Sequence, residues 1–265
     1  MQCEVKILIS WRRIARLLKR SDMVIEVLDI RDPITTRSRK VEELARILSK
    51  EIIVVLNKSD LVPKRIADLW IKKFNSYGLD TITFSMYNKK SKSILLKKLE
   101  QNLMYRDPLT ASIVGYPKTG KSTIINSLKG KKSASTSPIP GSPGYTKSFT
   151  RYKIREGIYI IDTPGIIPYG IGYPDSVIRG KNVEELKDPV RPAIDLLRKI
   201  LSYNPDAIAK AYGIGESDPY KILETLALKR MWIYKKSKEP IIEEAAKTII
   251  RDYHKAKIKF FVPPL

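Results

Sequence analysis

The sequence predicts an α/β fold: a first domain built on a mainly parallel sheet, followed by a small all-α C-terminal domain. Up to residue 162, short apolar runs rich in β-branched residues alternate with helical patterns. Such runs are typical of parallel strands that helices cover on both faces. Beyond residue 162 the helical patterns continue, but the apolar runs stop, apart from a strand-like segment at 257–262.

The individual elements follow from periodicity and from their flanking residues. The expected strands are 23–29, 52–57, 81–85, 111–115 and 158–162, with one nearer a sheet edge at 147–154. The expected helices are 5–20, 38–50, 63–77, 91–103, 121–129, 190–202, 205–211, 219–229 and 239–256. Two stretches rich in Gly, Pro or Ser, 131–146 and 164–182, are expected to be irregular. We place the domain boundary at the end of the second, which gives domains 1–182 and 183–265.

The segment GYPKTGKST (115–123) has the spacing G-x-x-x-x-G-K-S/T, and it lies between a predicted strand and a predicted helix. In this context glycines let backbone N–H groups turn toward phosphates. Lys121 is expected to reach the β- and γ-phosphates, and the Ser122 hydroxyl to bind Mg²⁺. A chance glycine turn is the alternative, which the strand and helix context disfavours. The nucleotide-contacting residues expected here are Pro117, Lys118, Thr119, Gly120, Lys121, Ser122 and Thr123.

Two further segments add groups for the metal and the γ-phosphate. DTPG (162–165) closes a predicted strand, so the Asp162 carboxylate is placed to hold Mg²⁺ through water, and the Gly165 N–H to sense the γ-phosphate. Thr146, in PGYTK (143–147), is the candidate second Mg²⁺ ligand and γ-phosphate sensor. Either segment alone is also ordinary turn chemistry. The expected metal ligands are Ser122, Thr146 and Asp162, and the expected catalytic groups belong to Lys121, Thr146 and Gly165.

The segment NKSD (57–60) closes another predicted strand and predicts guanine recognition. The Asp60 carboxylate can accept hydrogen bonds from guanine N1–H and the 2-amino group, whereas adenine presents a bare acceptor at N1. Asn57 is expected to brace the loop and the base, and the Lys58 stem to cover the ring. Ser85, at the end of another strand, is expected to complete the guanine side. The alternative for NKSD alone is an exposed polar turn.

The order of these motifs is unusual. In ordinary GTPases the phosphate loop comes first and the guanine motif last, whereas here residues 57–60 precede residues 115–122, Thr146 and residues 162–165. This circularly permuted order resembles the ribosome biogenesis GTPase A group, the YlqF/RbgA-like family. LDIRDP (28–33) is similar to the Asp-x-Arg segment of that family, and ILETLALKRMWIYKK (222–236) to its C-terminal helical domain.

The resemblance covers most of the chain and implies a P-loop GTPase domain that binds GTP and GDP with Mg²⁺ and hydrolyses GTP. It also implies a switch protein that assists assembly of the large ribosomal subunit by nucleotide-dependent binding to rRNA or to a subunit precursor. The chain departs from the family at two places. Lys118 stands where some members have an Asn that holds K⁺, so we do not expect activation by K⁺. The N-terminal stretch lacks the His that some bacterial members carry, and Ile166 follows Gly165, so we expect slow hydrolysis without a partner.

The net charge of +22 favours a polyanionic partner, and nucleic acid is the commonest one. The charge is concentrated: residues 86–156 carry 15 basic and 3 acidic side chains, a net charge of +12. The charge alone predicts a nucleic acid, and the resemblance implies that it is rRNA in the large ribosomal subunit or its precursor. A solvated lysine-rich surface is the alternative interpretation of the charge.

The same composition bounds the cellular setting. No run of about 18 apolar residues is present, so no membrane span and no membrane partner are expected. The first 20 residues lack the layout of a signal peptide, and Cys3 is the single cysteine, which together favour the cytoplasm. We also expect a monomer. Two other functions stay open at this stage: an rRNA-binding scaffold with a structural nucleotide site, and another P-loop NTPase.

Overall fold

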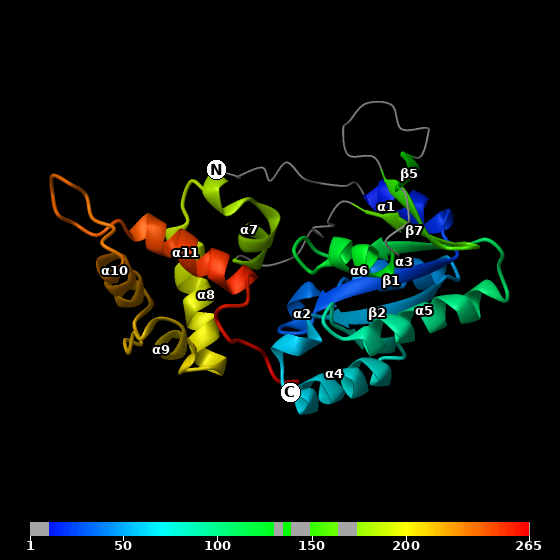
Figure 1. Ribbon diagram of the computed structural model, residues 1–265, viewed down its shortest axis with the longest axis horizontal. Coiled ribbons are helices and arrows are strands. Elements are labelled where there is room, and N and C mark those ends of the chain that lie inside the picture. The colour runs from blue at the N-terminus through cyan, green and yellow to red at the C-terminus, as the bar shows by residue number, and fades with distance from the viewer. Residues whose placement is uncertain (1–10, 130–134, 139–148, 164–173, 265) are drawn as a thin grey trace. The chain divides into compact units, whose positions relative to one another are not determined.

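The computed structural model describes residues 11–129, 135–138, 149–163 and 174–264 (Figure 1). The chain divides into two compact units, Met1–Tyr169 with Pro263–Leu265, and Gly170–Val262. The helical unit thus begins ahead of the boundary predicted after residue 182. Helix α7 (Asp175–Gly180) lies in a stretch expected to be irregular, and its Ile178 is buried in the apolar core of the second unit.

The first unit is built on a seven-stranded sheet in the order β3-β2-β1-β4-β7-β6-β5. Five strands pair in parallel: β1 (Met23–Asp29), β2 (Glu51–Asn57), β3 (Asp80–Phe84), β4 (Leu109–Val114) and β7 (Ile158–Asp162). Strands β6 (Thr150–Arg155) and β5 (Ser135–Pro138) add antiparallel. The mainly parallel sheet is confirmed. The prediction of an irregular stretch at 131–146 was wrong for β5. Its Ser, Thr and Pro residues are typical of loops, and its conformation is set by pairing with β6.

The helices of the first unit agree with the predicted segments: α1 (Trp11–Lys19), α3 (Arg39–Ile47), α4 (Lys64–Ser76), α5 (Lys89–Leu103) and α6 (Lys121–Leu128). Residues 5–10 of the first predicted helix lie outside the described residues. The short helices α2 (Pro33–Thr36) and η1 (Ser59–Leu61) were not predicted. Alternation along the strands divides the core: Ile25 and Val27 of β1 pack in one cluster with α5 and α6, and Val24 packs in another with α1 and α3.

The second unit is all-α in the part of the chain that is described. Its helices after α7 are η2 (Val183–Glu185), α8 (Val190–Tyr203), α9 (Ala207–Tyr212), α10 (Pro219–Lys229) and α11 (Ile242–His254). Segment 257–262, which has a strand-like pattern, forms no strand. Its Ile258 and Phe260 are buried in the helical core, so their apolar character reflects that packing. Across the described segments, no helix is long and apolar enough to cross a membrane.

Candidate nucleotide-binding site

The phosphate loop, the NKSD segment, Ser85 and Asp162 all lie at the carboxyl edge of the parallel strands. Asn57 at the end of β2 is in register with Phe84 at the end of β3, and Ile113 near the end of β4 is in register with Asp162 at the end of β7. The segments that follow these strands therefore start at the same edge of the sheet. Open α/β sheets bind ligands in the crevice outside this edge.

The guanine motif is fastened directly to the phosphate loop by two hydrogen bonds. Asn57 Nδ2 donates to the Thr119 carbonyl at 2.8 Å, and Lys58 Nζ donates to the Lys118 carbonyl at 2.9 Å. Asn57 is 3% exposed and Thr119 is fully buried, so the first bond is shielded from water. A side chain at Gly120 would collide with the Asn57 amide. The residue types expected for nucleotide binding thus also set the spacing between the two loops.

The carboxylate of Asp60 is exposed and is oriented by Ser85. Ser85 Oγ donates to Asp60 Oδ1 at 2.6 Å and accepts from the backbone N–H of Tyr87 at 3.2 Å. Ser91, which the sequence did not single out, accepts from the Ser85 N–H at 3.1 Å and donates back to the Ser85 carbonyl at 3.0 Å. Asp60 keeps its acceptor sites beyond the one that Ser85 uses, as bidentate guanine recognition requires.

The phosphate loop has the backbone that its glycines permit. Gly115 has φ 146° and Gly120 has φ 99°, and a side chain at Gly115 would collide with the Val27 carbonyl. Thr119 Oγ1 donates to the Tyr116 carbonyl at 2.9 Å and closes the turn. The loop leads into α6, whose first residues are Lys121, Ser122 and Thr123. Within the loop, Pro117 is half-buried and Lys118 is exposed. Backbone N–H groups at such a helix start attract anions.

Lys121 is the buried cation of this loop, with 7% of its surface exposed. Its Nζ donates to the carbonyls of Gly115 and Tyr116, both at 2.9 Å. Burial lowers the pKa of Lys121 to about 8, and attraction by Asp162 offsets part of that shift. A phosphate group beside the ammonium would favour its charged form, because opposite charges attract strongly where water is excluded.

Asp162 supplies a carboxylate oxygen suited to a cation. Its Oδ1 is buried, and among the described residues it has no hydrogen-bond partner. Burial raises the pKa of Asp162, and the Lys121 charge lowers it again in part. Mg²⁺ bound to nucleotides takes one or two protein oxygens and completes its shell with phosphates and water, so this single buried oxygen fits that ion. Thr163, which the sequence analysis missed, anchors the segment by donating to the Ile113 carbonyl at 2.8 Å.

Two predicted site residues cannot be placed, because Thr146 and Gly165 lie outside the described residues. Their roles stay predictions. Every other residue predicted to contact nucleotide belongs to the carboxyl edge of the sheet or to the loops that leave it.

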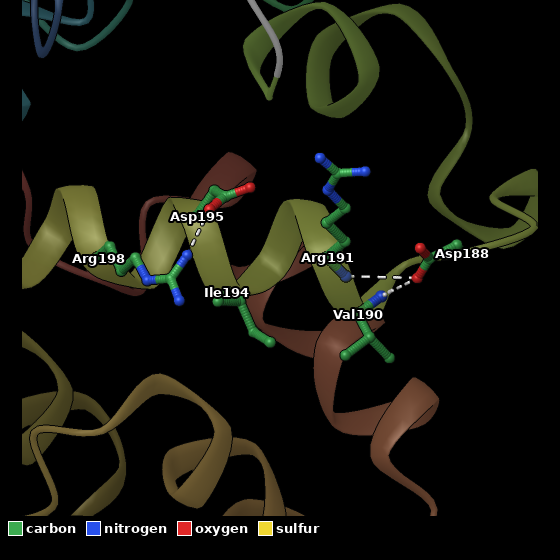
Figure 2. Close-up of a pocket in the computed structure, with 6 residues that line it drawn as sticks. All are labelled: Asp188, Val190, Arg191, Ile194, Asp195 and Arg198. Atoms are coloured by element: carbon green, nitrogen blue, oxygen red, sulfur yellow. Dashed lines mark hydrogen bonds and ion pairs between the residues drawn. The ribbon is translucent and has the colours of Figure 1, made fainter. Parts of the chain in front are cut away.

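A separate hollow of about 400 Å³ lies on the helical unit, along the first turns of α8 (Figure 2). Its polar contacts have local explanations. Asp188 Oδ1 accepts from the backbone N–H groups of Val190 and Arg191 in the first turn of α8, where N–H groups have no partner within the helix, and Arg198 pairs with Asp195 at 2.9 Å. Of the predicted nucleotide-contacting residues that the structure describes, none lines this hollow.

Comparison with known proteins gives a consistent set of similarities. A family model described as 50S ribosome-binding GTPase matches residues 110–231. A crystal structure of GNP-bound YlqF from T. maritima is 30% identical, with 94% of each chain covered and a TM-score of 0.65. A GDP-bound YlqF structure is 28% identical, with 96% of this chain and 99% of that chain covered and a TM-score of 0.70.

Curated relatives agree with these structures but are longer proteins. Nucleolar GTP-binding protein 2 of Cryptococcus neoformans var. grubii is 36% identical over 272 residues, which cover 96% of this chain and 38% of that protein. An uncharacterized GTP-binding protein of Methanocaldococcus jannaschii is 32% identical over 250 residues, which cover 93% of this chain and 65% of that protein. The chain therefore spans less than two thirds of the length of either relative.

Proposed function

Because the chain belongs to the YlqF-like circularly permuted GTPases, we propose that it binds GTP and GDP, hydrolyses GTP, and acts as a switch in assembly of the large ribosomal subunit. The observation that carries the nucleotide part is the pair of hydrogen bonds from Asn57 and Lys58 to the carbonyls of Thr119 and Lys118. They hold a guanine-reading loop and a phosphate loop at one spacing. In a P-loop ATPase or kinase that binds ATP, the adenine base would offer the Asp60 carboxylate neither an N1–H nor a 2-amino group.

The chemistry follows from the groups at the sheet edge. Ser122, Thr146 and Asp162 are the proposed Mg²⁺ ligands, with Asp162 acting through water, and the ion would neutralise charge on the β- and γ-phosphates. Lys121 is proposed to neutralise charge on the same phosphates, and the Gly165 N–H is proposed to contact the γ-phosphate. Stabilisation of charge on the transferring phosphoryl group accounts for most of catalysis in this reaction class.

Hydrolysis by the protein alone is proposed to be slow. Efficient Ras-like enzymes place a water-orienting Gln after the glycine that corresponds to Gly165, and here that residue is Ile166. An isoleucine side chain has no hydrogen-bonding group. The group that orients the attacking water must then come from RNA, from a ribosomal protein or from another part of the chain.

The proposed partner is rRNA in the large subunit or its precursor. Residues 86–156, which include the phosphate loop, carry the net charge of +12. In the helical unit Lys235, Lys236 and Lys238 are exposed beside Tyr234, which is 48% exposed and available for stacking on a base. Tyr253, on α11, is 1% exposed and packs in the helical core, so its ring is not available for stacking on a base. Exposed lysines and an exposed ring in one short segment suit RNA contact.

The order of the chain suggests how nucleotide would control this contact. Asp162 ends β7, and the helical unit begins eight residues later in the sequence, at Gly170. A change at residues 162–172 that depends on the γ-phosphate would thus act on the segment joining the two units. The predicted cytoplasmic location and monomeric state stay predictions, and the name of the Cryptococcus relative refers to the nucleolus.

Co-sedimentation with purified large ribosomal subunits tests the switch, in the presence of GDP or a non-hydrolysable GTP analogue. We expect stronger association in one nucleotide state, a steep fall with salt, and faster GTP turnover when subunits are added. Reversing the charge at Lys235 and Lys236 should weaken association and leave GDP affinity unchanged. The same change at Lys64 and Arg65, exposed on α4, is the matched control. Equal association in both nucleotide states would refute the switch and favour the scaffold.

A further inference from the structure

Asp29, at the end of β1, lies at the same sheet edge as the two nucleotide loops but belongs to neither. It is fully buried and in register with Asn57. Its carboxylate accepts from Arg31 three times: from Nε at 3.0 Å, from Nη2 at 2.8 Å and from the backbone N–H at 3.2 Å. It also accepts from Lys58 Nζ at 2.7 Å. A turn held by a plain Asp–Arg pair would not need this additional contact with Lys58.

Lys58 therefore uses one ammonium for two partners, the Asp29 carboxylate and the Lys118 carbonyl. Both lysines have a left-handed backbone, with φ 65° at Lys58 and φ 64° at Lys118. This conformation is unfavourable for a residue with a side chain and persists where the surroundings impose it. The contacts of the Lys58 ammonium join these two strained positions, which belong to different loops.

We propose that Asp29 is a positioning residue for nucleotide binding. Its carboxylate, held in place by Arg31, keeps the Lys58 ammonium on the Lys118 carbonyl, and so keeps the guanine loop and the phosphate loop at the spacing that one nucleotide spans. The inference rests on the proposed binding of GTP and GDP at this edge.

A negative charge is needed at this position for a physical reason. The Lys58 side chain is 21% exposed, so the ammonium can exchange its protein contacts for water. Arg31, which is 1% exposed, is fixed nearby and repels it. Without the carboxylate charge, hydration and this repulsion would both favour a Lys58 side chain that points into solvent. The Lys118 carbonyl would then lose this donor, and the guanine loop would lose a direct hydrogen bond to the phosphate loop.

The test measures GDP affinity in Asp29→Asn, which keeps the shape and removes the charge. We expect GDP and GTP to bind at least about ten-fold more weakly, as for loss of a charged hydrogen bond. Glu26→Gln is the matched control, because Glu26 is an equally buried acid on the same strand and contacts Ser38 instead of a nucleotide loop. Its GDP affinity should stay within about two-fold of the wild type.

A double-mutant cycle with Lys58→Met separates positioning from a general structural role. If Asp29 acts through Lys58, Asp29→Asn should change GDP affinity by less than about two-fold in the Lys58→Met background. Wild-type affinity in Asp29→Asn, or the same loss in both backgrounds, would overturn the proposal.

Folding is controlled with a second variant. Asp29→Asn with Arg31→Gln removes both buried charges, so no unpaired guanidinium remains, and it should reproduce the loss of GDP affinity. If this folded pair bound GDP as the wild type does, the proposal would be wrong. Failure of the wild type to bind GDP would refute the proposed function instead.

Discussion

Substitution of Asn57 by Ala tests whether its hydrogen bond to the phosphate loop stabilises the fold and the nucleotide site. The change removes the donor to the Thr119 carbonyl, at 2.8 Å, and leaves that buried acceptor unpaired. An unpaired buried polar group costs about 1–3 kcal/mol. In a unit of this size each kcal/mol lowers Tm by about 2–4 °C, so nucleotide-free Asn57→Ala should melt about 2–12 °C lower than the wild type.

The same substitution should also reduce stabilisation by GDP. Ligand at 100 times its Kd adds about 2.7 kcal/mol to the free energy of unfolding. If loss of this hydrogen bond weakens GDP binding ten-fold, the same GDP concentration adds only about 1.4 kcal/mol to the free energy of unfolding. The GDP-induced rise in Tm then falls to about half. Thermal melts with and without GDP measure both effects. Asn126→Ala, at an exposed position of α6, is the control. Wild-type Tm and a wild-type response to GDP in Asn57→Ala would refute the role of this bond.

Three further outcomes are expected. Asp60→Asn should bind GDP about 10-fold to 150-fold more weakly and gain affinity for a xanthine nucleotide, since an amide donates where the carboxylate accepted; competition titrations check this. Burial and repulsion by Glu42 raise the pKa of Glu26 well above its ordinary value of 4.5, so its contribution to the free energy of unfolding is full below that pH and is lost as pH rises through the folded-state pKa. Urea titrations at several pH values should show this loss in the wild type and not in Glu26→Gln. Finally, replacing Na⁺ with K⁺ should leave GTP turnover nearly unchanged, because Lys118 stands at the position of the K⁺-coordinating Asn; strong activation by K⁺ would contradict this.

Most of the sheet could be predicted because buried parallel strands leave a strong local signal. β1 and β2 consist largely of β-branched and apolar residues, and their bounds agree with the prediction within one residue. β5 left no such signal, because a short strand of Ser, Thr and Pro is specified by its pairing with β6. Helix α7 was not predicted because prolines and glycines precede it, and Ile178, the one apolar residue among its three buried residues, gives no helical periodicity.

The candidate site divides in the same way. Gly120, Lys121 and the NKSD segment could be predicted because each belongs to a short contiguous motif whose residue types indicate its chemistry. Asp29 and Thr163 could not be assigned roles, because what they do depends on partners far along the chain. The sequence separation between Asp29 and Lys58 is 29 residues, and between Thr163 and Ile113 it is 50 residues. Only the pairing of the strands brings those partners together.

Strand pairing also explains why a permuted motif order can give one site. The hydrogen bonds from the guanine motif to the phosphate loop connect residues that are far apart in the sequence, with separations of 60 and 62 positions. Local conformational preferences therefore cannot form them. They depend on β1 lying between β2 and β4 in the sheet, where both neighbours run parallel to it. This requirement concerns only the positions of the strands in the sheet and does not depend on their order in the sequence. What the order does change is the segment that follows Asp162, since in this chain it continues into the helical unit. The permutation therefore leaves the chemistry of the sheet edge intact and alters which part of the protein is attached to the end of β7.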